Sequence, residues 1–515
     1  MNRQVPPDNE ISRFLEDVKE QIQYKPIRGE IEEEIKAHIE DRTLEYIEMG
    51  VEEKEAVHRA VEQMGDGTSI GVMLNETRQV KNNRALTGMV FAAVVLGIMG
   101  NFINYEPAWE AGLLYGFFDV IHNLYYFIWG LIVFTVVYYK GYTFLVKHSK
   151  ITLNIFVITG LTAILLSLLK GPFFQYINFS VFGIERILWS GHVLGFSLIL
   201  LSGPILALAA YKFRNKGKTV ILLYILSLLT VILIQYKLNR EFVLSAILVL
   251  LVTSASTLFT LIYKGLLNYN KKKLFVYGCI GMFAIIGIYG TVSVKDQKRN
   301  IIQFLNPEEL TQNHWQDSYN GLLIQDLLRK TEPFGQVGLT KEELMTYGTG
   351  AWFFDGEEVN QITKYLHYDE ASVTLEDILP QHYHNNYRFA FWILNYGRIP
   401  AILLILLVMG IYGVLFFVTS KIHNKLGHIL ALSCTLSLAV QMMLYLLGNL
   451  GYQYGYFSTL PFISEGLCSI TTNMILVGVI LSAYRYDKVI REEKYFNREG
   501  KVSKEAEQQV GRLSR

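Results

Sequence analysis

The sequence predicts an all-α protein: a polytopic bundle of about ten transmembrane helices behind a small soluble N-terminal helical domain. Of the 515 residues, 51% are hydrophobic and 18% are charged, whereas about a quarter of a soluble domain is usually charged. From Leu86 onward, apolar runs recur at the length of about 20 residues that a helix needs to cross a bilayer. The 47 basic and 46 acidic residues nearly cancel, so no nucleic-acid partner is expected.

Residues 1 to about 80 are expected to form the soluble domain. They are highly charged, and Ile31, Ile35 and Ile39 recur at four-residue spacing, as on the buried face of a helix. Gly50 predicts a helix end. No apolar run in this region is long enough for a secretory signal, so the N-terminus is expected in the cytoplasm.

The membrane domain is expected over residues 85–487, followed by a charged cytoplasmic tail at 488–515. Ten apolar runs within it are long enough to span a bilayer. We place the spans near 85–103, 121–139, 151–169, 192–211, 219–235, 241–262, 274–292, 394–418, 427–448 and 464–484.

Basic residues alternate with these spans and predict the orientation. The loops around 140–150, 212–218, 264–273 and 421–428 are rich in Lys and Arg, and such loops stay in the cytoplasm. Both termini are therefore expected inside. The long polar segment at about 293–393 is expected outside, and its length makes it the natural place for chemistry.

Two motifs in this membrane region resemble the SEDS family (FtsW/RodA/SpoVE type). The run Lys295–Glu308, with Phe304-Leu305-Asn306-Pro307-Glu308 at its core, resembles the start of the family's large extracytoplasmic loop. The stretch from Gly448-Asn449 through Leu460-Pro461 to Ser464 and Ser469 resembles its last-helix signature. The resemblance covers about residues 86–487. It implies a multi-pass bacterial plasma-membrane protein of peptidoglycan synthesis in division, shape or sporulation, with the bilayer, an undecaprenyl-linked precursor and a single-pass transpeptidase as partners.

The N-terminal region resembles the permease-prefix, or HAAS, signalling domain. The resemblance rests on His38-Ile39-Glu40-Asp41 and Met64-Gly65-Asp66. It implies a cytoplasmic partner for this domain. A generic helical bundle is the alternative interpretation.

The resemblance also implies a glycosyltransferase that uses an acidic loop residue as general base. A sugar hydroxyl is a poor nucleophile, so a carboxylate must take its proton. The family's Leu-Pro-Glu-x-His-Thr-Asp-Phe-x-Phe stretch corresponds to residues 379–391. Counting from Pro380 places Asn385 at the Asp position, and counting back from Phe389 places Arg388 there. Neither accepts a proton, so the catalytic residue is unknown, with Glu465 and Asp377 as candidate substitutes.

Other polar residues are candidates for substrate binding. Basic side chains at outer helix ends could pair with the pyrophosphate of a polyprenyl donor, or they could reach the bilayer interface as ordinary snorkelling residues. No cofactor is expected. His367, His382 and His384 have too weak a spacing for a metal site, so none is predicted. The candidate binding residues are Arg186, Lys237, Arg240, Ser464 and Ser469.

Three functions are compatible with the sequence. The first is a divergent SEDS protein of cell-wall synthesis whose precursor glycosyltransferase activity is in doubt. The second is a non-enzymatic membrane regulator or scaffold that binds a partner in cell-wall synthesis. The third is a transporter or lipid-binding permease, which intramembrane acids would favour, although the predicted helix centres are poor in acids.

Overall fold

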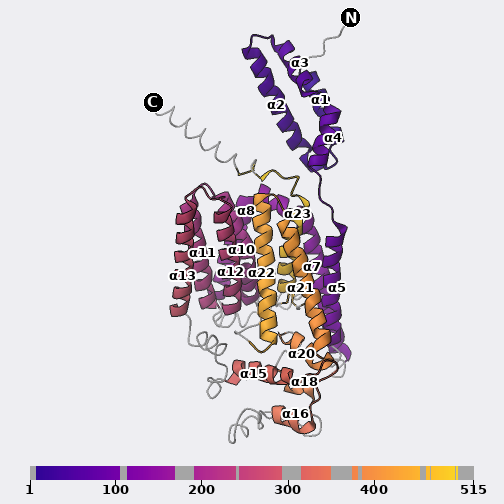
Figure 1. Cartoon of the computed structure of the whole chain (residues 1–515), viewed down its shortest axis with the longest axis vertical. Coiled ribbons are helices and arrows are strands. Elements are labelled where there is room, and N and C mark those ends of the chain that lie inside the picture. The colour runs from indigo at the N-terminus through magenta and orange to yellow at the C-terminus, as the bar shows by residue number, and fades with distance from the viewer. Residues whose placement is uncertain are drawn as a thin grey trace. The chain divides into compact units, whose positions relative to one another are not determined.

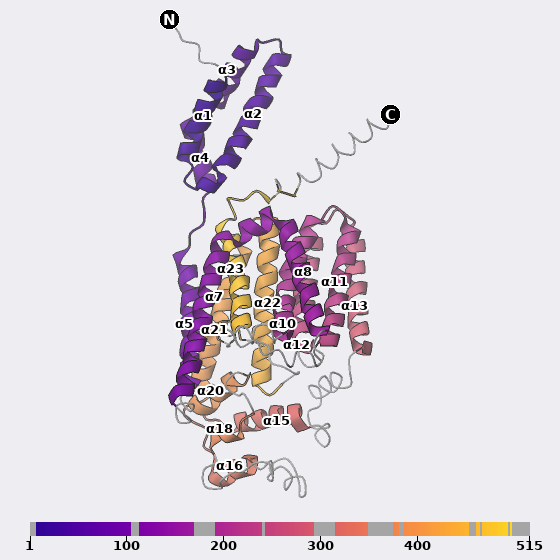
Figure 2. The same ribbon diagram turned by 180° about the vertical axis from the view of Figure 1, so that it is seen from behind.

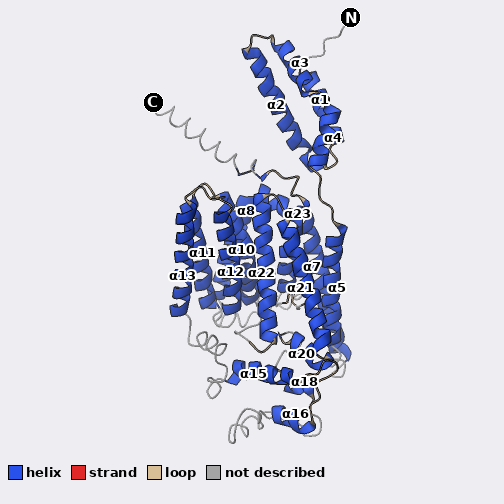
Figure 3. Ribbon diagram, in the orientation of Figure 1, coloured by secondary structure: helices blue, strands red, loops and turns tan. Residues whose placement is uncertain are grey.

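Every regular secondary-structure element among the residues that the computed structural model describes is a helix (Figure 3). This confirms the predicted all-α class. The chain divides into two compact units, one made of Met1–Asn83 with Tyr484–Arg515 and the other of Arg84–Ala483. The described residues are 7–104, 113–168, 191–238, 243–292, 315–348, 374–380, 386–452, 460–463, 466–492 and 495–496.

The N-terminal part of the first unit is a bundle of short helices. Its core is the apolar stripe expected from the sequence, with Ile31, Ile35 and Ile39 all buried against the neighbouring helices. The helix predicted to stop at Gly50 ends at Glu48. The helices are α1 (Pro7–Gln21), the 3₁₀ turn η1 (Lys25–Ile27), α2 (Arg28–Glu48), α3 (Glu53–Met64) and α4 (Gly67–Thr77).

The second unit is built on long apolar helices that run side by side (Figures 1 and 2). Each of the ten predicted spans falls on one of them. They are α5 (Arg84–Asn104), α7 (Leu113–Lys147), α8 (Ser149–Leu168), α10 (Gly191–Lys212), α11 (Gly217–Leu238), α12 (Val243–Tyr263), α13 (Lys271–Val292), α21 (Arg398–Ser420), α22 (Lys425–Asn449) and α23 (Leu467–Arg485).

Four helical segments among the described residues are long and apolar enough to cross a membrane. By length and composition they indicate a membrane protein, while the total of ten spans stays a prediction. The segments are Leu124–Lys147, Arg398–Ser420, Lys425–Asn449 and Leu467–Arg485.

The centre of the bundle is α22, which packs against α10, α12 and α21. Small polar side chains are buried along these contacts, among them Thr253 and Ser254 on α12 and Ser433 and Thr435 on α22. The hydroxyls of Thr419 on α21 and Thr435 lie 2.9 Å apart and bond the two helices. Small residues let helix backbones approach closely in a bilayer, where no water drives the helices together.

Shorter helices lie between α13 and α21 in the chain and gather at one end of the bundle (Figures 1 and 2). Lys330, which directly follows α15, links that helix to α16, because its ammonium lies 2.9 Å from the Glu343 carboxylate. The Glu343 carboxylate also accepts the backbone N–H of Thr340, and these contacts lower the pKa of Glu343 to about 2. The helices are α15 (Trp315–Arg329), α16 (Lys341–Gly348), α18 (Leu375–Ile378) and α20 (Arg388–Tyr396).

A glycine corner divides the segment in which the sequence predicts a single span from residue 394. Gly397 has φ +90°, a backbone conformation that residues with a Cβ rarely adopt. It separates α20 from α21. A Cβ at Gly397 would lie 2.6 Å from the Cα of Phe334. The span therefore begins at Arg398, and α20 is a separate helix that carries several candidate site residues.

Candidate functional site

The candidate site lies where α20 meets the ends of α22 and of the turn at residues 460–463. Asn449, the last residue of α22, is fully buried here. Its side-chain oxygen accepts the backbone N–H groups of Phe389 and Ala390 at 2.9 and 3.0 Å. Its amide nitrogen donates to the carbonyl oxygens of Asn386 and Tyr445, both at 3.0 Å. Asn449 therefore satisfies free N–H groups at the start of α20 and joins that helix to α22.

Arg388, one of the two residues at the family's Asp position, is 1% exposed. Its guanidinium donates a hydrogen bond of 2.9 Å to the carbonyl oxygen of Ile463. A guanidinium has five donors and no acceptor. Arg388 thus supports the turn at 460–463 and offers no lone pair to an incoming hydroxyl proton.

The supported turn contains a backbone conformation that is rare outside glycine. Phe462 has φ +73°, which costs on the order of 1–3 kcal/mol and occurs at sites where the surroundings fix the chain. Gly97 on α5 makes room for it, because a Cβ at Gly97 would collide with the carbonyl oxygen of Phe462. One turn further, a Cβ at Gly100 would lie 3.1 Å from the ring of Trp392 on α20. The glycine face of α5 is therefore shaped to fit both α20 and the turn.

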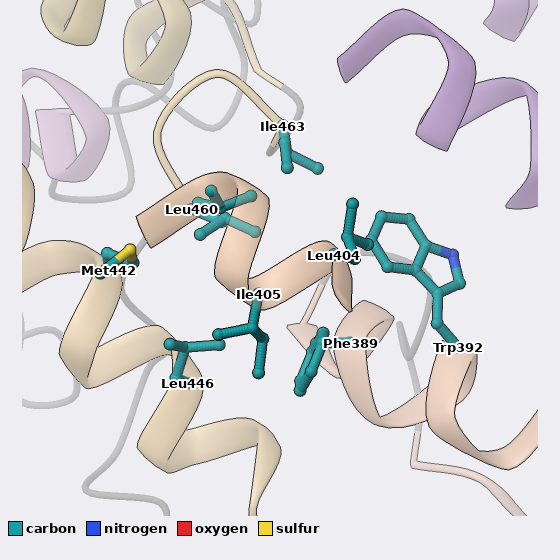
Figure 4. A pocket seen from close by; sticks show the side chains of 9 residues that line it. Phe389, Trp392, Leu404, Ile405, Met442, Leu446, Leu460 and Ile463 are labelled. Carbon is teal, nitrogen blue, oxygen red and sulfur yellow. The ribbon is translucent and has the colours of Figure 1, made fainter. Parts of the chain in front are cut away.

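An apolar pocket opens beside this turn (Figure 4). Phe389 and Trp392 of α20 face side chains of α21 and α22 across it. The enclosed space is small, about 10 Å³, and its lining is almost entirely apolar, which suits hydrocarbon better than a sugar. The lining residues are Phe389, Trp392, Leu404, Ile405, Val408, Met442, Leu446, Leu460 and Ile463.

Asp377, one of the two candidate substitute bases, has a structural task. It is exposed at the first turn of α18, where its carboxylate accepts the backbone N–H and the hydroxyl of Thr374, both at 2.8 Å. The two residues form a capping box at the start of this helix. An acid in this position stabilises the helix end, so its carboxylate is already engaged.

Of the candidate binding residues, Ser469 can be placed. It is buried in the first turn of α23, and its hydroxyl accepts a hydrogen bond of 3.4 Å from the side-chain amide of Asn473. The other candidates lie outside the described residues, or in the case of Lys237 have a side chain that is not described. They are Asn385, Glu465, Arg186, Lys237, Arg240 and Ser464, together with His367, His382 and His384.

Sequence reasoning missed several residues that shape this site. Asn449 is part of the last-helix motif in the sequence, but nothing in the sequence indicates that it caps a distant helix. Gly97 and Gly100 were not singled out, although their spacing of three places them on one helix face. Within the described part of the chain, no cluster of three or more His, Cys, Asp or Glu side chains could hold a metal ion.

The fold and this site define a class: an all-helical membrane protein with a helical loop region closing one end of its bundle. Residues 373–489 match the cell cycle protein family FtsW/RodA/SpoVE, and they include α20 to α23 and the turn. This part of the chain resembles that family, also called SEDS, as the last-helix motif at residues 448–469 indicated.

Individual relatives are distant. A probable peptidoglycan glycosyltransferase FtsW of Thioalkalivibrio sp. (strain K90mix) is 27% identical over 161 residues, which are 30% of this chain and 36% of that relative's length. A solved chain from a study of how a peptidoglycan synthase complex coordinates polymerization and crosslinking has the same fold. It matches with a TM-score of 0.51 and 16% identity over 79% of this chain and 98% of its own.

Proposed function

We propose that this protein serves bacterial cell-wall synthesis as a SEDS membrane protein that binds a lipid-linked glycan precursor and polymerises it little or not at all. The observation that carries the proposal is Arg388, a buried guanidinium bonded to the Ile463 carbonyl at one of the two positions that motif spacing aligns with the family's acid; the other position holds Asn385, which is no base either. A general base typically contributes about 10²–10⁴ in rate. Its replacement by a pure donor removes that contribution unless another carboxylate takes over.

The apolar pocket supports the binding half of the proposal. Its lining is apolar and comes from α20, α21, α22 and the turn, so this surface is chemically suited to contact the polyprenyl chain of a lipid-linked precursor. The basic candidates Arg186, Lys237 and Arg240 would then pair with the pyrophosphate. The fold shared with a chain of a peptidoglycan synthase complex supports a single-pass transpeptidase as a protein partner.

The N-terminal domain supports a regulatory interpretation of the same protein. We propose that residues 1 to about 80 form a HAAS-like domain that reads a cytoplasmic signal, and that both termini lie in the cytoplasm of the cell. In this second candidate function the SEDS bundle is a scaffold for a cell-wall partner. Arg388 favours it too, because a scaffold needs the turn at 460–463 held in place and needs no base. We propose cell division, cell shape and sporulation as the processes of cell-wall synthesis in which the protein could act.

A polymerisation assay with the purified full-length protein tests the first proposal. Fluorescent lipid-linked disaccharide is supplied with and without a single-pass transpeptidase, and precursor binding is measured in parallel. We expect binding without glycan product. Robust product from the unmodified chain would refute the loss of polymerase activity.

Three variants identify a replacement base should product form. Glu465→Gln and Asp377→Asn remove the two candidate acids, and Glu342→Gln removes an exposed acid of the first turn of α16 as a matched control. Loss of product in one of the first two, with the control unchanged, would assign the base to that residue. Absence of both product and precursor binding would instead favour the scaffold function. If the protein then moved lipid across the membrane of reconstituted vesicles, the permease function would be favoured.

A further inference from the structure

The segment that follows the last membrane helix folds into the N-terminal unit. Tyr484 and Arg485 end α23 but already belong to that unit with the rest of the C-terminal segment. Side chains of the segment are buried in the way core residues are: Tyr486 is 2% exposed and Val489 1%. The segment is therefore an integral part of the N-terminal domain.

Glu34 on α2 is the first charged anchor of this segment. One of its carboxylate oxygens lies 2.7 Å from the guanidinium of Arg78, which is 5% exposed. The other carboxylate oxygen pairs with Arg491 of the C-terminal segment. Burial alone would raise the pKa of Glu34, but the two arginines outweigh it and hold that pKa below its usual value. Glu34 thus stays ionised and binds both arginines.

A second anchor lies between the linker that follows α4 and the C-terminal segment. The Lys81 ammonium is 2.7 Å from Asp487, whose side chain is fully buried. The backbone N–H of Lys81 donates to the carbonyl oxygen of Arg485 at 2.9 Å. The hydroxyl of Tyr495 adds a bond of 3.2 Å to Glu30 on α2. Charges and backbone together fix one register between the two chain ends.

Such pairing specifies an arrangement more than it strengthens one. Removing charges from water is costly, and apolar side chains of similar size often stabilise an interface better than ion pairs do. Breaking one partner of a buried pair, in contrast, leaves an uncompensated charge and weakens the contact strongly. An attachment built this way is well defined when closed and sensitive to the loss of one charge.

We propose that residues 484–492, with Tyr495 and Phe496, are a clasp through which the N-terminal domain holds the end of α23 and from which it can release that end. The domain is joined covalently to the start of α5 and, through the clasp, to the end of α23. Any partner that competes for Glu30 or Glu34 would open the clasp and free the last membrane helix. The site that such a partner would take is acidic, so it would carry basic residues.

Hydrogen exchange in the full-length protein in nanodiscs tests the clasp. In Glu34→Gln, amides of residues 486–492 should exchange about tenfold faster, which corresponds to about 1.4 kcal/mol of easier opening. Glu55→Gln is the matched control, because Glu55 pairs with Arg59 on the exposed face of α3. Unchanged exchange of residues 486–492 in Glu34→Gln would overturn the proposal.

The reciprocal variant guards against a general folding defect. The Arg491 side chain is largely exposed and belongs to the C-terminal segment, not to helices α1 to α4, so Arg491→Gln should leave the packing of those helices intact. It should still raise exchange about threefold in residues 28–40 of α2, the size of effect expected for a partly exposed pair. No change in α2 would contradict a clasp. Added salt should speed exchange in the unmodified protein more than in Glu34→Gln, because the latter has already lost the pairing charge.

Discussion

Buried polar side chains near the candidate site act on the backbone. Asn449 binds two N–H groups and two carbonyls, and Arg388 binds one carbonyl. Each joins segments about 60 to 75 residues apart in the chain. A buried amide with all its hydrogen bonds formed is stable, whereas an unpaired one is costly. These two residues therefore decide whether α20 and the turn keep their places.

Replacement of Asn449 should destabilise the protein markedly. Asn449→Leu leaves the N–H groups of Phe389 and Ala390 buried without a partner, and we expect a loss of about 2–4 kcal/mol. Asn449→Asp should also be harmful, since it removes both donors and buries a charge. Thermal unfolding of the detergent-solubilised protein, followed by size-exclusion fluorescence, measures the loss. Asn395→Ala on α20 is the control and should cost less; equal midpoints for all these variants would rule out the capping role.

At the scale of single residues, the sequence indicated which residues belong to the site better than it indicated what each side chain does. Motif spacing alone identified Arg388 as one of two residues that could stand at the family's Asp position, and the structure shows that its side chain supports the turn at 460–463. The role of Asn449 was not predictable, since its partners on α20 lie about 60 residues away and no local pattern connects them. Asn385 and Glu465 lie outside the described residues, so the roles expected for them stay predictions.

Among the elements, α5 packs closely against α20 and the turn at 460–463 because α5 has glycines at the points of contact. Gly97 admits the carbonyl of Phe462, and Gly100 admits the ring of Trp392. The left-handed Phe462 and the Arg388 bond lie in the same turn. A movement of α5 toward the turn would therefore displace the backbone that Arg388 supports.

A methyl group at position 97 should displace this turn. Gly97→Ala collides with a backbone atom that no side-chain rotation can move, so we expect a loss of about 2–3 kcal/mol from overpacking. Gly88→Ala on the same helix is the matched control, because its Cβ would meet nothing within 4 Å; in a helix this exchange should be neutral or favourable. Thermal unfolding midpoints in one detergent would decide. A Gly97→Ala protein as stable as Gly88→Ala would mean that the turn is not held against α5.

The helices themselves were the most predictable feature. Apolar runs of bilayer length placed a helix over every predicted span, because a long continuous pattern needs no tertiary information. Ends were less accurate: α7 extends over Leu113–Lys147 where 121–139 was predicted. The corner at Gly397 was missed since its cause is the approach of Phe334 from another segment.

For the whole molecule, the predicted orientation in the membrane is open to a direct test. We expect residues 300–390 outside and both termini inside, because basic loops alternate with the spans. In a chain whose own Cys279, Cys434 and Cys468 are replaced, a cysteine at Asn360 should react with an impermeant maleimide in intact cells. A cysteine at Lys216, in a basic loop, should react only after permeabilisation. The reverse pattern would invert the topology.

The joining of the two chain ends could not have been predicted from sequence. Glu34 and Arg491 are 457 residues apart, and charged residues in a terminal segment usually indicate only solvation. The sequence predicted a separate charged tail from residue 488. The family resemblance did not help either, because the matched region ends at residue 489.

That closure has a mechanical consequence. In a protein pulled by its two termini, the load would pass first through the contacts of Glu34 and Lys81 with the C-terminal segment. As long as these ion pairs hold, the N-terminal unit bears the tension and shields α5 and α23 from extraction. Rupture would then be sequential, with the ionic fastening failing before any helix leaves the bilayer. The shortest mechanical path through this chain therefore bypasses the membrane.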